Sequence, residues 1–388
     1  MNVQVLIDAR HGLVWCGYAF ALASMAYSLI SAFATRKIFS AAPPNREALP
    51  HVTILKPLYG AEPETYECLR SFCEQAYPQY QVIFGVCNPQ DPAVAVVRRL
   101  QTEFPGRDLV LAADCNEHGS NRKVNNLINM MTLARHDYLV VSDSDVKVDR
   151  DYLAKLIPPL LDAGVGIVTC GYRGVPRPGI WSLLGSMYIN EWFMPSVRVA
   201  ALMGYRSFAF GATIGIRRET LARIGGFNSV SNQLADDYRL GELTRQLGLR
   251  TVLSDLEVDT LVEDCTAADL VAHELRWRRT IRNLNPYSYV FSVVTLGLPV
   301  TALQLLFTQG AAPAAAIFSA TAVASTLIHL NARRPGASIP VLLLVPFRDL
   351  LHFGLWIWSF ATRRVQWGDD RYEVSRDGAA QPIEGLGQ

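Results

Sequence analysis

The chain has 388 residues, of which 50% are hydrophobic and 18% are charged. This composition is too apolar for an average soluble enzyme and too charged for a protein that lies wholly in a membrane, so it indicates a soluble core joined to membrane segments. A formal net charge of +1 at pH 7 leaves no basic excess to neutralise a phosphate backbone, which argues against nucleic acid as a partner.

The first membrane segment is predicted at residues 13–33, an apolar run without a charge. It is long enough to cross a hydrocarbon core of roughly 30 Å as a helix. Arg36 and Lys37 follow it, and by the positive-inside rule they place the chain after them in the cytoplasm. The alternative is a cleaved signal peptide, because Ala32-Phe33-Ala34 resembles a cleavage site. The run is longer than is usual in a signal peptide, so we expect a transmembrane helix within residues 1–35.

Residues 50–285 alternate short apolar runs with longer amphipathic stretches, the pattern of parallel β-α-β units. Strands are expected at 52–55, 81–87, 109–112, 138–142 and 166–170, with helices at 93–104 and 124–134 between them. We therefore predict a doubly wound α/β domain with a mostly parallel sheet and a site beyond the carboxyl ends of the strands. Neither a G-x-G-x-x-G nor a P-loop pattern follows the first strand, so a nucleotide would be held in another way.

The redox state of this domain is indicated by its cysteines. The chain has seven cysteines and no C-x-x-C pair. This odd number and this spacing argue against both a disulfide framework and a zinc site. They favour a reducing, cytosolic environment.

Asp91-Pro92 follows the second predicted strand. Asp before Pro favours the start of a turn. An aspartate near the carboxyl end of a strand could equally accept a hydrogen bond from the base of a nucleotide. Both interpretations stay open from the residues alone.

Asp143 and Asp145 follow the fourth predicted strand. Two carboxylates at positions i and i+2 of an extended segment point to the same side. They suit one hard cation, Mg²⁺ or Mn²⁺, which a substrate diphosphate would also bind, and which would neutralise a leaving nucleoside diphosphate. A solvated loop is the alternative, but the position at a strand end in a chain with other clustered acids favours the metal.

The interrupted aromatic stretch at residues 181–197 includes Trp192 and Phe193. Asn190, Glu191 and Pro195 make it too polar and too broken to span a membrane. We expect it to lie at the membrane interface and to admit a lipid, as amphipathic segments do. Ordinary core packing is the alternative.

Asp236 and Asp237 open a stretch with helical periodicity at residues 238–247. An aspartate at this point could cap the helix. It could instead deprotonate an acceptor hydroxyl that attacks an anomeric carbon, which is the work of a general base.

Residues 273–282 are strongly basic and come just before the second apolar region. The guanidinium group of Arg276 suits a diphosphate, and the indole of Trp277 offers a flat apolar wall. We interpret Arg278, Arg279 and Arg282 as topological charges that mark the cytoplasmic side of the membrane.

Three further apolar runs lie at residues 287–307, 311–330 and 339–360, within a predicted membrane region at 286–365 that precedes a tail at 366–388. Two of these runs are expected to span. The third contains Pro346, Arg348, Asp349 and His352, so crossing, re-entry and a break at Pro346 are alternatives. Arg333-Arg334 and Arg363-Arg364 both mark cytoplasmic ends.

The order of these motifs resembles a known family. Asp91-Pro92, Asp143, Leu-Ala-Asp-Asp237-Tyr and Arg276-Trp277 match the D, D, D, (Q/R)xxRW pattern of the family-2-like processive and ceramide glucosyltransferases. Leu-Lys56-Pro-Leu, Asn-Asn-Leu (125–127) and Gly-Gly-Phe (225–227) extend the likeness to the ceramide glucosyltransferases. A closer resemblance is to the bacterial hopanoid-biosynthesis glycosyltransferases, carried by residues 70–75, 121–124, 210–214 and 273–277.

The resemblance implies a GT-A fold and inverting transfer of N-acetylglucosamine from UDP-N-acetylglucosamine to the terminal hydroxyl of bacteriohopanetetrol. By motif position Asp91 would contact uridine, and Asp143 with Asp145 would hold the metal-bound diphosphate. Asp237 would be the base, and Arg276 with Trp277 would steady the leaving group. Lys56 would be a further contact of the nucleotide sugar. One departure is His273, which stands where the pattern has Gln or Arg.

The resemblance further implies a UDP-sugar donor, a lipid acceptor and a place in the bacterial inner membrane with the catalytic domain facing the cytoplasm. The near alternative is glucosyl transfer to ceramide. A processive polysaccharide synthase is weaker, because the usual Gln-x-x-Arg-Trp is absent. An alternative of another class is a non-catalytic membrane scaffold that kept the fold, against which the complete set of acids and Arg-Trp argues.

Overall fold

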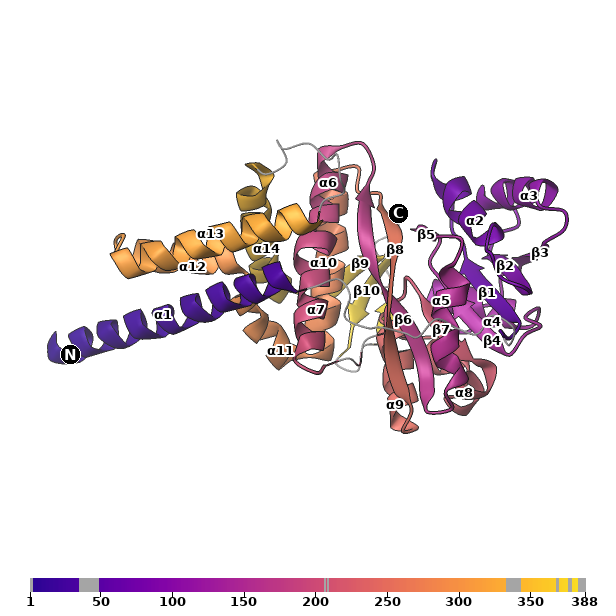
Figure 1. The fold of residues 1–388 in the computed structure, drawn as a ribbon, viewed down its shortest axis with the longest axis horizontal. Coiled ribbons are helices and arrows are strands. Elements are labelled where there is room, and N and C mark those ends of the chain that lie inside the picture. Colours follow the sequence, from indigo (N-terminus) through magenta and orange to yellow (C-terminus); the bar gives the residue numbers. More distant parts are fainter. Residues whose placement is uncertain are drawn as a thin grey trace. The chain divides into compact units, whose positions relative to one another are not determined.

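A computed structural model describes residues 3–34, 49–205, 207, 209–332, 343–367, 370–375 and 379–382. The chain forms two compact units (Figure 1). The helical unit comprises Met1–Arg36, Pro178–Gly204 and Asp264–Asp369, and the sheet unit comprises Lys37–Arg177, Tyr205–Glu263 and Asp370–Gln388. This division differs from the predicted contiguous segments, because residues 178–204 and 264–285 belong to the helical unit.

The sheet unit is built on an eight-stranded sheet of order β3-β2-β1-β4-β7-β6-β8-β5. Its strands are β1 (Val52–Pro57), β2 (Tyr80–Val86), β3 (Asp108–Ala113), β4 (Tyr138–Val141), β5 (Val146–Lys147), β6 (Val165–Pro176), β7 (Ile214–Arg217) and β8 (Arg250–Val262). The pairs β1–β2, β1–β4, β2–β3 and β6–β8 are parallel. Strand β7 is antiparallel to β4 and β6, and β5 is antiparallel to β8. The sheet is therefore mixed, with parallel pairs dominant.

The five predicted strands are all present in this sheet. Strands β1 and β2 are buried along their whole length, which is why they appear in the sequence as continuous apolar runs. The prediction missed β5, β7 and β8. Strand β8 carries a register shift against β6 between Ser254 and Glu257, and this bulge breaks the alternation of polar and apolar residues by which a strand is recognised.

Helices connect and cover these strands. They are α2 (Thr65–Cys73), α3 (Ala93–Glu103), α4 (Arg122–Met131), α5 (Tyr152–Leu156), η2 (Pro158–Leu161), α8 (Arg218–Arg223), η4 (Phe227–Val230) and α9 (Asp236–Gln246). Helices α3 and α4 confirm the predictions at 93–104 and 124–134. One core cluster joins α4, α8 and α9 to the central strands through residues such as Leu127, Leu221 and Leu240. Near the end of the chain, β10 (Asp370–Val374) pairs antiparallel with β11 (Ala380–Pro382).

Helix α4 sits close against β2. The amide of Asn126 donates to the carbonyl of Gly85 at 2.7 Å, and a Cβ at Gly85 would lie 2.2 Å from Asn126 Oδ1. Asn121 caps the helix by accepting from the N–H of Val124 at 3.0 Å, as N-cap residues do. These contacts fix the first turn of α4, which carries Lys123.

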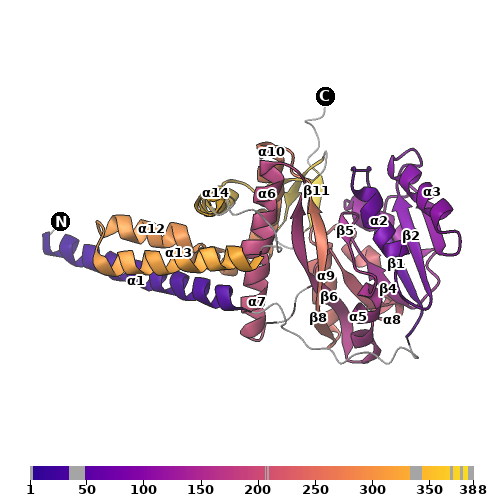
Figure 2. The same cartoon turned by 45° about the horizontal axis from the view of Figure 1, so that its top comes forward.

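The helical unit consists mainly of long helices. They are α1 (Val3–Phe33), α6 (Ile180–Met187), η3 (Tyr188–Phe193), α7 (Met194–Leu202), α10 (Ala267–Leu284), α11 (Pro286–Phe291), η5 (Ser292–Thr295), α12 (Gly297–Phe307), α13 (Ala312–Ala332), α14 (Leu344–Trp358) and η7 (Ser359–Ala361), followed by strand β9 (Arg364–Trp367). Helices α1, α12 and α13 lie side by side (Figures 1 and 2). Polar side chains join them, because Gln304 donates to the carbonyl of Val14 at 3.3 Å and Asn331 to that of Ala32 at 2.7 Å.

Two described helices are long and apolar enough to cross a membrane, His11–Phe33 and Ala312–Ala332. They match the predicted runs at 13–33 and 311–330. The predicted run at 287–307 is not one straight helix, because Pro286–Thr295 and Gly297–Phe307 meet at 70°. Pro299 explains the break, since it cannot donate to the carbonyl four residues before it. This bent pair is a third candidate span only if both halves cross together.

The third predicted run is partly described as α14, which has 15 residues and is shorter than the roughly 20 that a straight span needs. Pro346 lies in the first turn of α14, a position that a proline tolerates because the helix begins there, so crossing, re-entry and a break at this proline all stay predictions. Residues 339–342 lie outside the described residues. So do Arg36, Lys37, Arg333 and Arg334, so the topology drawn from them stays a prediction.

The aromatic stretch at 181–197 is helical throughout. Tyr188–Phe193 forms a π-helical turn between α6 and α7, and Pro195 follows it in the first turn of α7. The wider turn lets the chain continue past a residue that lacks an N–H. Turns of this kind frequently mark functional positions in helices.

The contact between α4 and β2 is open to a test by substitution. We expect Gly85→Ala to lower the free energy of unfolding by about 1–3 kcal/mol, because the added methyl overlaps Asn126 and pushes α4 away. Gly106→Ala is the matched control, since a Cβ there meets nothing within 4 Å. Unfolding of the detergent-solubilised proteins by denaturant, followed by fluorescence, measures both. Equal stability of the two variants would contradict the packing described.

Candidate active site

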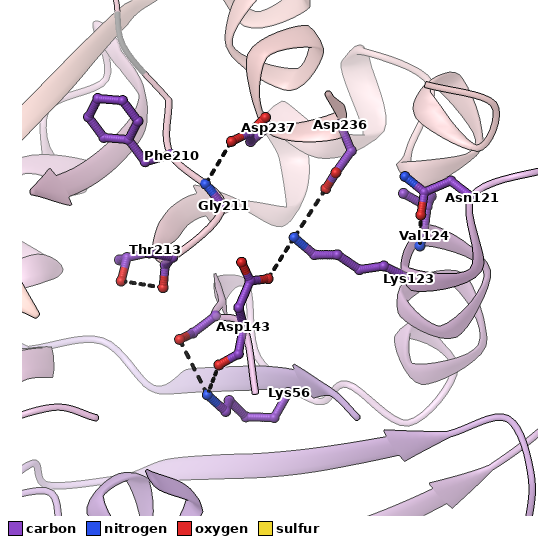
Figure 3. A network of polar contacts seen from close by, with 12 residues as sticks. Lys56, Asn121, Lys123, Val124, Asp143, Phe210, Gly211, Thr213, Asp236 and Asp237 are labelled. Carbon is purple, nitrogen blue, oxygen red and sulfur yellow. Dashed lines mark hydrogen bonds and ion pairs between the residues drawn. The ribbon is translucent and has the colours of Figure 1, made fainter. Parts of the chain in front are cut away.

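A network of acids centred on Lys123 lies where β4, α4 and α9 meet (Figure 3). Lys123 Nζ is 2.7 Å from Asp143 Oδ1 and 3.4 Å from Asp236 Oδ2. Asp143 follows the carboxyl end of β4, at the edge of the sheet where the sequence placed the site. Burial alone would lower the pKa of Lys123, but Asp143 and Asp236 raise it overall. The ammonium group therefore stays charged and balances carboxylates that would otherwise repel one another.

Asp237 is the second residue of α9. Its Oδ2 accepts from the N–H of Gly211 at 2.8 Å and its Oδ1 from that of Tyr238 at 2.7 Å. The N-cap position is Ala235, which makes no side-chain cap, so the alternative of a simple N-cap aspartate is wrong. Burial and the neighbouring Asp236 raise the pKa of Asp237 to about 6, although Lys123 and the two N–H groups oppose them. A carboxylate with this pKa is ionised at neutral pH and is a stronger base than an ordinary aspartate.

Gly211 is the point on which the charged groups converge. A Cβ added there would lie 3.2 Å from Asp143 Oδ2, 3.3 Å from Lys123 Nζ and 3.5 Å from Asp237 Oδ2. A hydrogen atom at this position keeps space open between the acids, which is a common use of glycine where a backbone approaches a ligand. Neither Lys123 nor Gly211 is predicted from the sequence to have a role in the site. Both lie inside motifs at 121–124 and 210–214 that carried the family resemblance, and that was the available signal.

Lys56 lies in β1, and its side chain is fully buried. Its ammonium group donates to the backbone carbonyl of Asp143 and to the hydroxyl of Ser142 at 3.4 Å, and it lies 3.9 Å from the centre of the Phe72 ring. Burial lowers the pKa of Lys56 to about 8, against the nearby Cys68, Asp145 and Asp143. Lys56 thus supports the turn that carries Asp143, and its direct contact with a nucleotide sugar stays a prediction.

Asp145 is held by the edge of the sheet. Its carbonyl accepts from the N–H of Leu261 in β8 at 3.0 Å. Glu263 follows the same strand, and burial together with Asp145 raises the pKa of Glu263 to about 7. This second acid beside Asp145 has no signal in the sequence, because the pairing of β5 with β8 brings it there.

The donor set of Asp143 and Asp145 fits a hard divalent cation in part. Within the described residues no three His, Cys, Asp or Glu side chains are grouped so that they could hold a metal by themselves. Magnesium is commonly bound by one or two carboxylates together with substrate phosphates. The two aspartates thus stay the predicted ligands, with the phosphates as the remaining donors.

Asp91 joins two loops at the same edge of the sheet. Its Oδ2 accepts from the N–H of Gly60 at 2.9 Å and its Oδ1 from that of Ala93, the first residue of α3, at 2.8 Å. It therefore does start the turn, which was one of the two interpretations. Each carboxylate oxygen can accept more than one hydrogen bond, so the contact with uridine stays a prediction.

Arg276 and Trp277 lie on α10, in the helical unit, and their contact with a diphosphate stays a prediction. His273 stands where the family pattern has Gln or Arg, and its contacts account for a histidine at this position. Its Nδ1 is 3.2 Å from Asp264 Oδ1, and its ring meets that of Trp277 edge-on with 4.8 Å between centroids. The imidazole thereby fixes the indole, together with Phe193, whose ring centroid is 6.0 Å away.

The topological interpretation of Arg278 needs correction because its side chain is buried, whereas that of Arg279 and Arg282 stays a prediction. Arg278 is 1% exposed and pairs with Glu274 at 3.1 Å. Arg279 donates to the carbonyl of Arg364 at 2.6 Å, and Arg282 donates to that of Thr362 at 2.9 Å. Arg279 and Arg282 thus join α10 to the chain that follows α14, whereas Arg278 pairs within α10.

Comparison with protein families decides the membership of the chain. The model of the family described as Glycosyl transferase family 21 matches residues 16–380. The chain belongs to this family. Its curated relatives include ceramide glucosyltransferase 3 of Caenorhabditis elegans, 26% identical over 53% of this chain and 45% of the relative. They also include the ceramide glucosyltransferase of Komagataella phaffii, 33% identical over 34% of this chain and 26% of the relative. The matches thus cover less than half of the length of these relatives.

Solved structures show the same fold. The mannosyltransferase PcManGT from Pyrobaculum calidifontis, in complex with GDP-Man and Mn²⁺, aligns with a TM-score of 0.50 and 20% identity. The alignment covers 90% of this chain and 95% of that one. The likeness confirms the expected GT-A type of α/β fold for the family 21 chain.

The raised pKa of Asp237 has a consequence for the stability of this family 21 protein. In the folded state the pKa is about 6, against 3.8 for an ordinary aspartate, so wild-type stability falls as the pH rises through about 6. We expect Asp237→Asn to raise the free energy of unfolding by about 1–3 kcal/mol at neutral pH. The gain should shrink as the pH falls from about 6 towards 3.8.

Denaturant melts over this pH range measure the effect, with Asp149→Asn, at an exposed position, as the control. A loss of stability in Asp237→Asn at neutral pH would show that the carboxylate is not penalised by burial.

Proposed function

We propose that this family 21 protein is an inverting, membrane-bound glycosyltransferase that moves a sugar from a UDP-sugar to a hydroxyl group of a lipid. The observation that carries the proposal is the convergence on Gly211 of Asp237, Lys123 and Asp143. A basic carboxylate and a cation-binding carboxylate thus border one small space. An inverting displacement needs this pair at the two ends of the reacting sugar.

The donor half of the site would hold the diphosphate. Asp143 and Asp145 would bind Mg²⁺ or Mn²⁺ on the side of the phosphates, and the cation would stabilise the charge of the leaving UDP. The Mn²⁺ in the structure of PcManGT supports a divalent cation. Lys123, charged and 2.7 Å from Asp143, places a second positive group beside the phosphates. Arg276 and Trp277 would complete this half, and Asp91 would bind the uracil.

The acceptor half of the site would use Asp237. The oxygen of the acceptor hydroxyl attacks the anomeric carbon and forms the new glycosidic bond, while its proton passes to the Asp237 carboxylate. The bond between that carbon and the phosphate oxygen breaks, and UDP leaves with the electron pair. The single displacement inverts the anomeric centre. The N–H groups of Gly211 and Tyr238 hold the carboxylate in place, so little reorganisation is needed during the transfer.

The resemblance to the hopanoid enzymes supports one choice of sugar and lipid. The proposed reaction is therefore transfer of N-acetylglucosamine to bacteriohopanetetrol at the bacterial inner membrane. The second candidate is glucosyl transfer to ceramide, and the names of the curated relatives favour it. A scaffold without activity is the candidate of another class. The raised pKa of Asp237 argues against it, because a buried like-charge cluster is costly and is typical of catalytic sites.

Mass spectrometry of lipids tests the proposal. Purified protein with Mg²⁺ or Mn²⁺ is incubated with bacteriohopanetetrol and either UDP-N-acetylglucosamine or UDP-glucose, alongside matched ceramide samples. We expect an N-acetylhexosamine adduct on the hopanoid. A hexose on ceramide would assign the chain to the sphingolipid reaction, and no adduct in any sample would support the scaffold. Asp237→Asn should lose transfer by about 10²–10⁴-fold while it keeps its affinity for UDP.

The pH dependence of transfer identifies the base. Since the pKa of Asp237 is about 6, we expect kcat/KM to fall as the pH drops below about 6. Lys123 lowers this pKa, so Lys123→Met should move the midpoint of the profile to higher pH. Lys155→Met, at an exposed lysine paired with Asp151, should leave the midpoint in place. An unmoved midpoint in Lys123→Met would contradict the assignment of Asp237 as the titrating base.

A further inference from the structure

The helical unit contains a polar cavity among its apolar helices. The cavity measures about 40 Å³, which is room for a few groups of the size of a hydroxyl or a water molecule. Its lining comes from α1, the π-helical turn, α12, α13 and α14, and includes Tyr188, Glu191, Trp192, Ser325, Arg348 and His352. Ionisable groups at such a place in a membrane protein are costly and usually functional.

Several polar atoms at this cavity, donors among them, have no hydrogen-bond partner among the residues that the structure describes. Arg348 is 3% exposed and uses Nη2 to bind Glu274 at 2.5 Å, but its Nε and Nη1 atoms make no hydrogen bond. The Nε2 atom of His352 and the hydroxyl of Tyr188 are likewise buried without a partner. An unmet buried donor costs about 1–3 kcal/mol. A bound molecule with acceptor atoms would remove this cost.

The charges around the cavity limit what it can bind. Two carboxylates, Glu191 and Asp349, line it together with the guanidinium group of Arg348. Glu191 also pairs with His329 at 2.6 Å. A phosphate group would face the two carboxylates, and an ammonium group would face Arg348. An uncharged group that carries hydroxyls suits both, because a hydroxyl accepts from the guanidinium and donates to a carboxylate.

The surroundings of the cavity indicate the rest of the ligand. The rings of Tyr188 and Trp192 stack with 5.1 Å between centroids, and His352 meets Trp192 edge-on at 4.4 Å. Helices α1 and α13 are the two candidate membrane spans, and they carry exposed side chains such as Trp15 and Val323. A ligand suited to this cavity and these helices thus combines an apolar body with a polar, uncharged end.

We propose that this cavity binds the uncharged, hydroxyl-bearing end of a membrane lipid through Arg348, His352 and Glu191. Only the identification of this lipid as the acceptor rests on the proposed function. The binding itself follows from the unmatched donors, the mixed charges and the aromatic wall. The two candidate acceptors, bacteriohopanetetrol and ceramide, both belong to this chemical class.

The test is lipid retention measured by native mass spectrometry. The purified full chain is exchanged into nanodiscs that contain bacteriohopanetetrol, ceramide or, as the anionic comparison, phosphatidylglycerol. We expect at least one uncharged lipid to be retained about tenfold more than phosphatidylglycerol. Equal retention of phosphatidylglycerol would overturn the uncharged class, and a wild-type protein that retains none of the three would overturn the site.

Variants tie the retention to the cavity. Ser325→Leu fills the cavity from α13, and Thr326→Leu is the matched control, since Thr326 is exposed on the same helix. His352→Phe keeps the aromatic wall but removes the unmatched nitrogen. We expect both cavity variants to retain about tenfold less of the uncharged lipid and Thr326→Leu to behave as wild type. Equal retention in Ser325→Leu and Thr326→Leu, at wild-type melting temperatures, would refute the site.

Failure of the proposed function is distinguishable from failure of the lipid site. Asp237→Asn changes the sheet unit alone and should keep the lipid while it loses transfer. UDP binding, measured on each cavity variant, should stay at the wild-type level. If Ser325→Leu lost the lipid but transferred sugar at the wild-type rate, the lipid in the cavity would not be the acceptor. That result would overturn the identification and leave the transferase intact.

Discussion

The ion pair between Lys123 and Asp143, 2.7 Å apart, is the interaction on which the active site depends. Asp143, Asp236 and Asp237 come from two segments that would repel each other if the lysine were absent, since like charges in a poorly solvated space raise one another's pKa. The position of Lys123 follows from the close fit of α4 on β2 at Gly85 and from the cap made by Asn121. The packing of α4 on β2 thereby places the positive charge of Lys123 among the aspartates. This arrangement of charges gives Asp237 a pKa suited to base catalysis.

The parts of the fold that the sequence predicted are those with a local signal. Buried parallel strands such as β1 and β2 are continuous apolar runs in the sequence. Carboxylates at the end of a strand or the start of a helix are predicted as site residues from their position. Lys123 and Gly211 carry no such signal, because a lysine in the first turn of a helix is ordinarily a surface charge and a glycine in a loop is ordinarily a turn. Only the tertiary structure brings them together with Asp143. Strand β8 escaped prediction because its bulge interrupts the alternation.

The arginines of α10 show that a basic stretch can consist of exposed topological charges or of buried, paired side chains. A basic stretch before a membrane helix is typical of topology, yet Arg278 is buried beside Glu274, four residues before it. The spacing of an acid and a base at i and i+4 was the available sign of a paired, interior role. Arg348 binds the other oxygen of the same carboxylate, so Glu274 joins α10 to α14. Breaking such a buried set by removing one member is far more harmful than losing a surface pair.

The interleaving of the two units has a consequence for the order in which the protein matures. Tyr372 donates to the carbonyl of Ser120 at 3.4 Å, and Gln233 forms a β-bridge with Ala379. Ser120 and Gln233 lie three residues before Lys123 and Asp236, in the segments that lead into α4 and α9. Their partners emerge from the ribosome only after the helices of the helical unit have been synthesised. During translation the segments that lead to Lys123 and Asp236 therefore gain these two contacts only after the helices of the helical unit have left the ribosome.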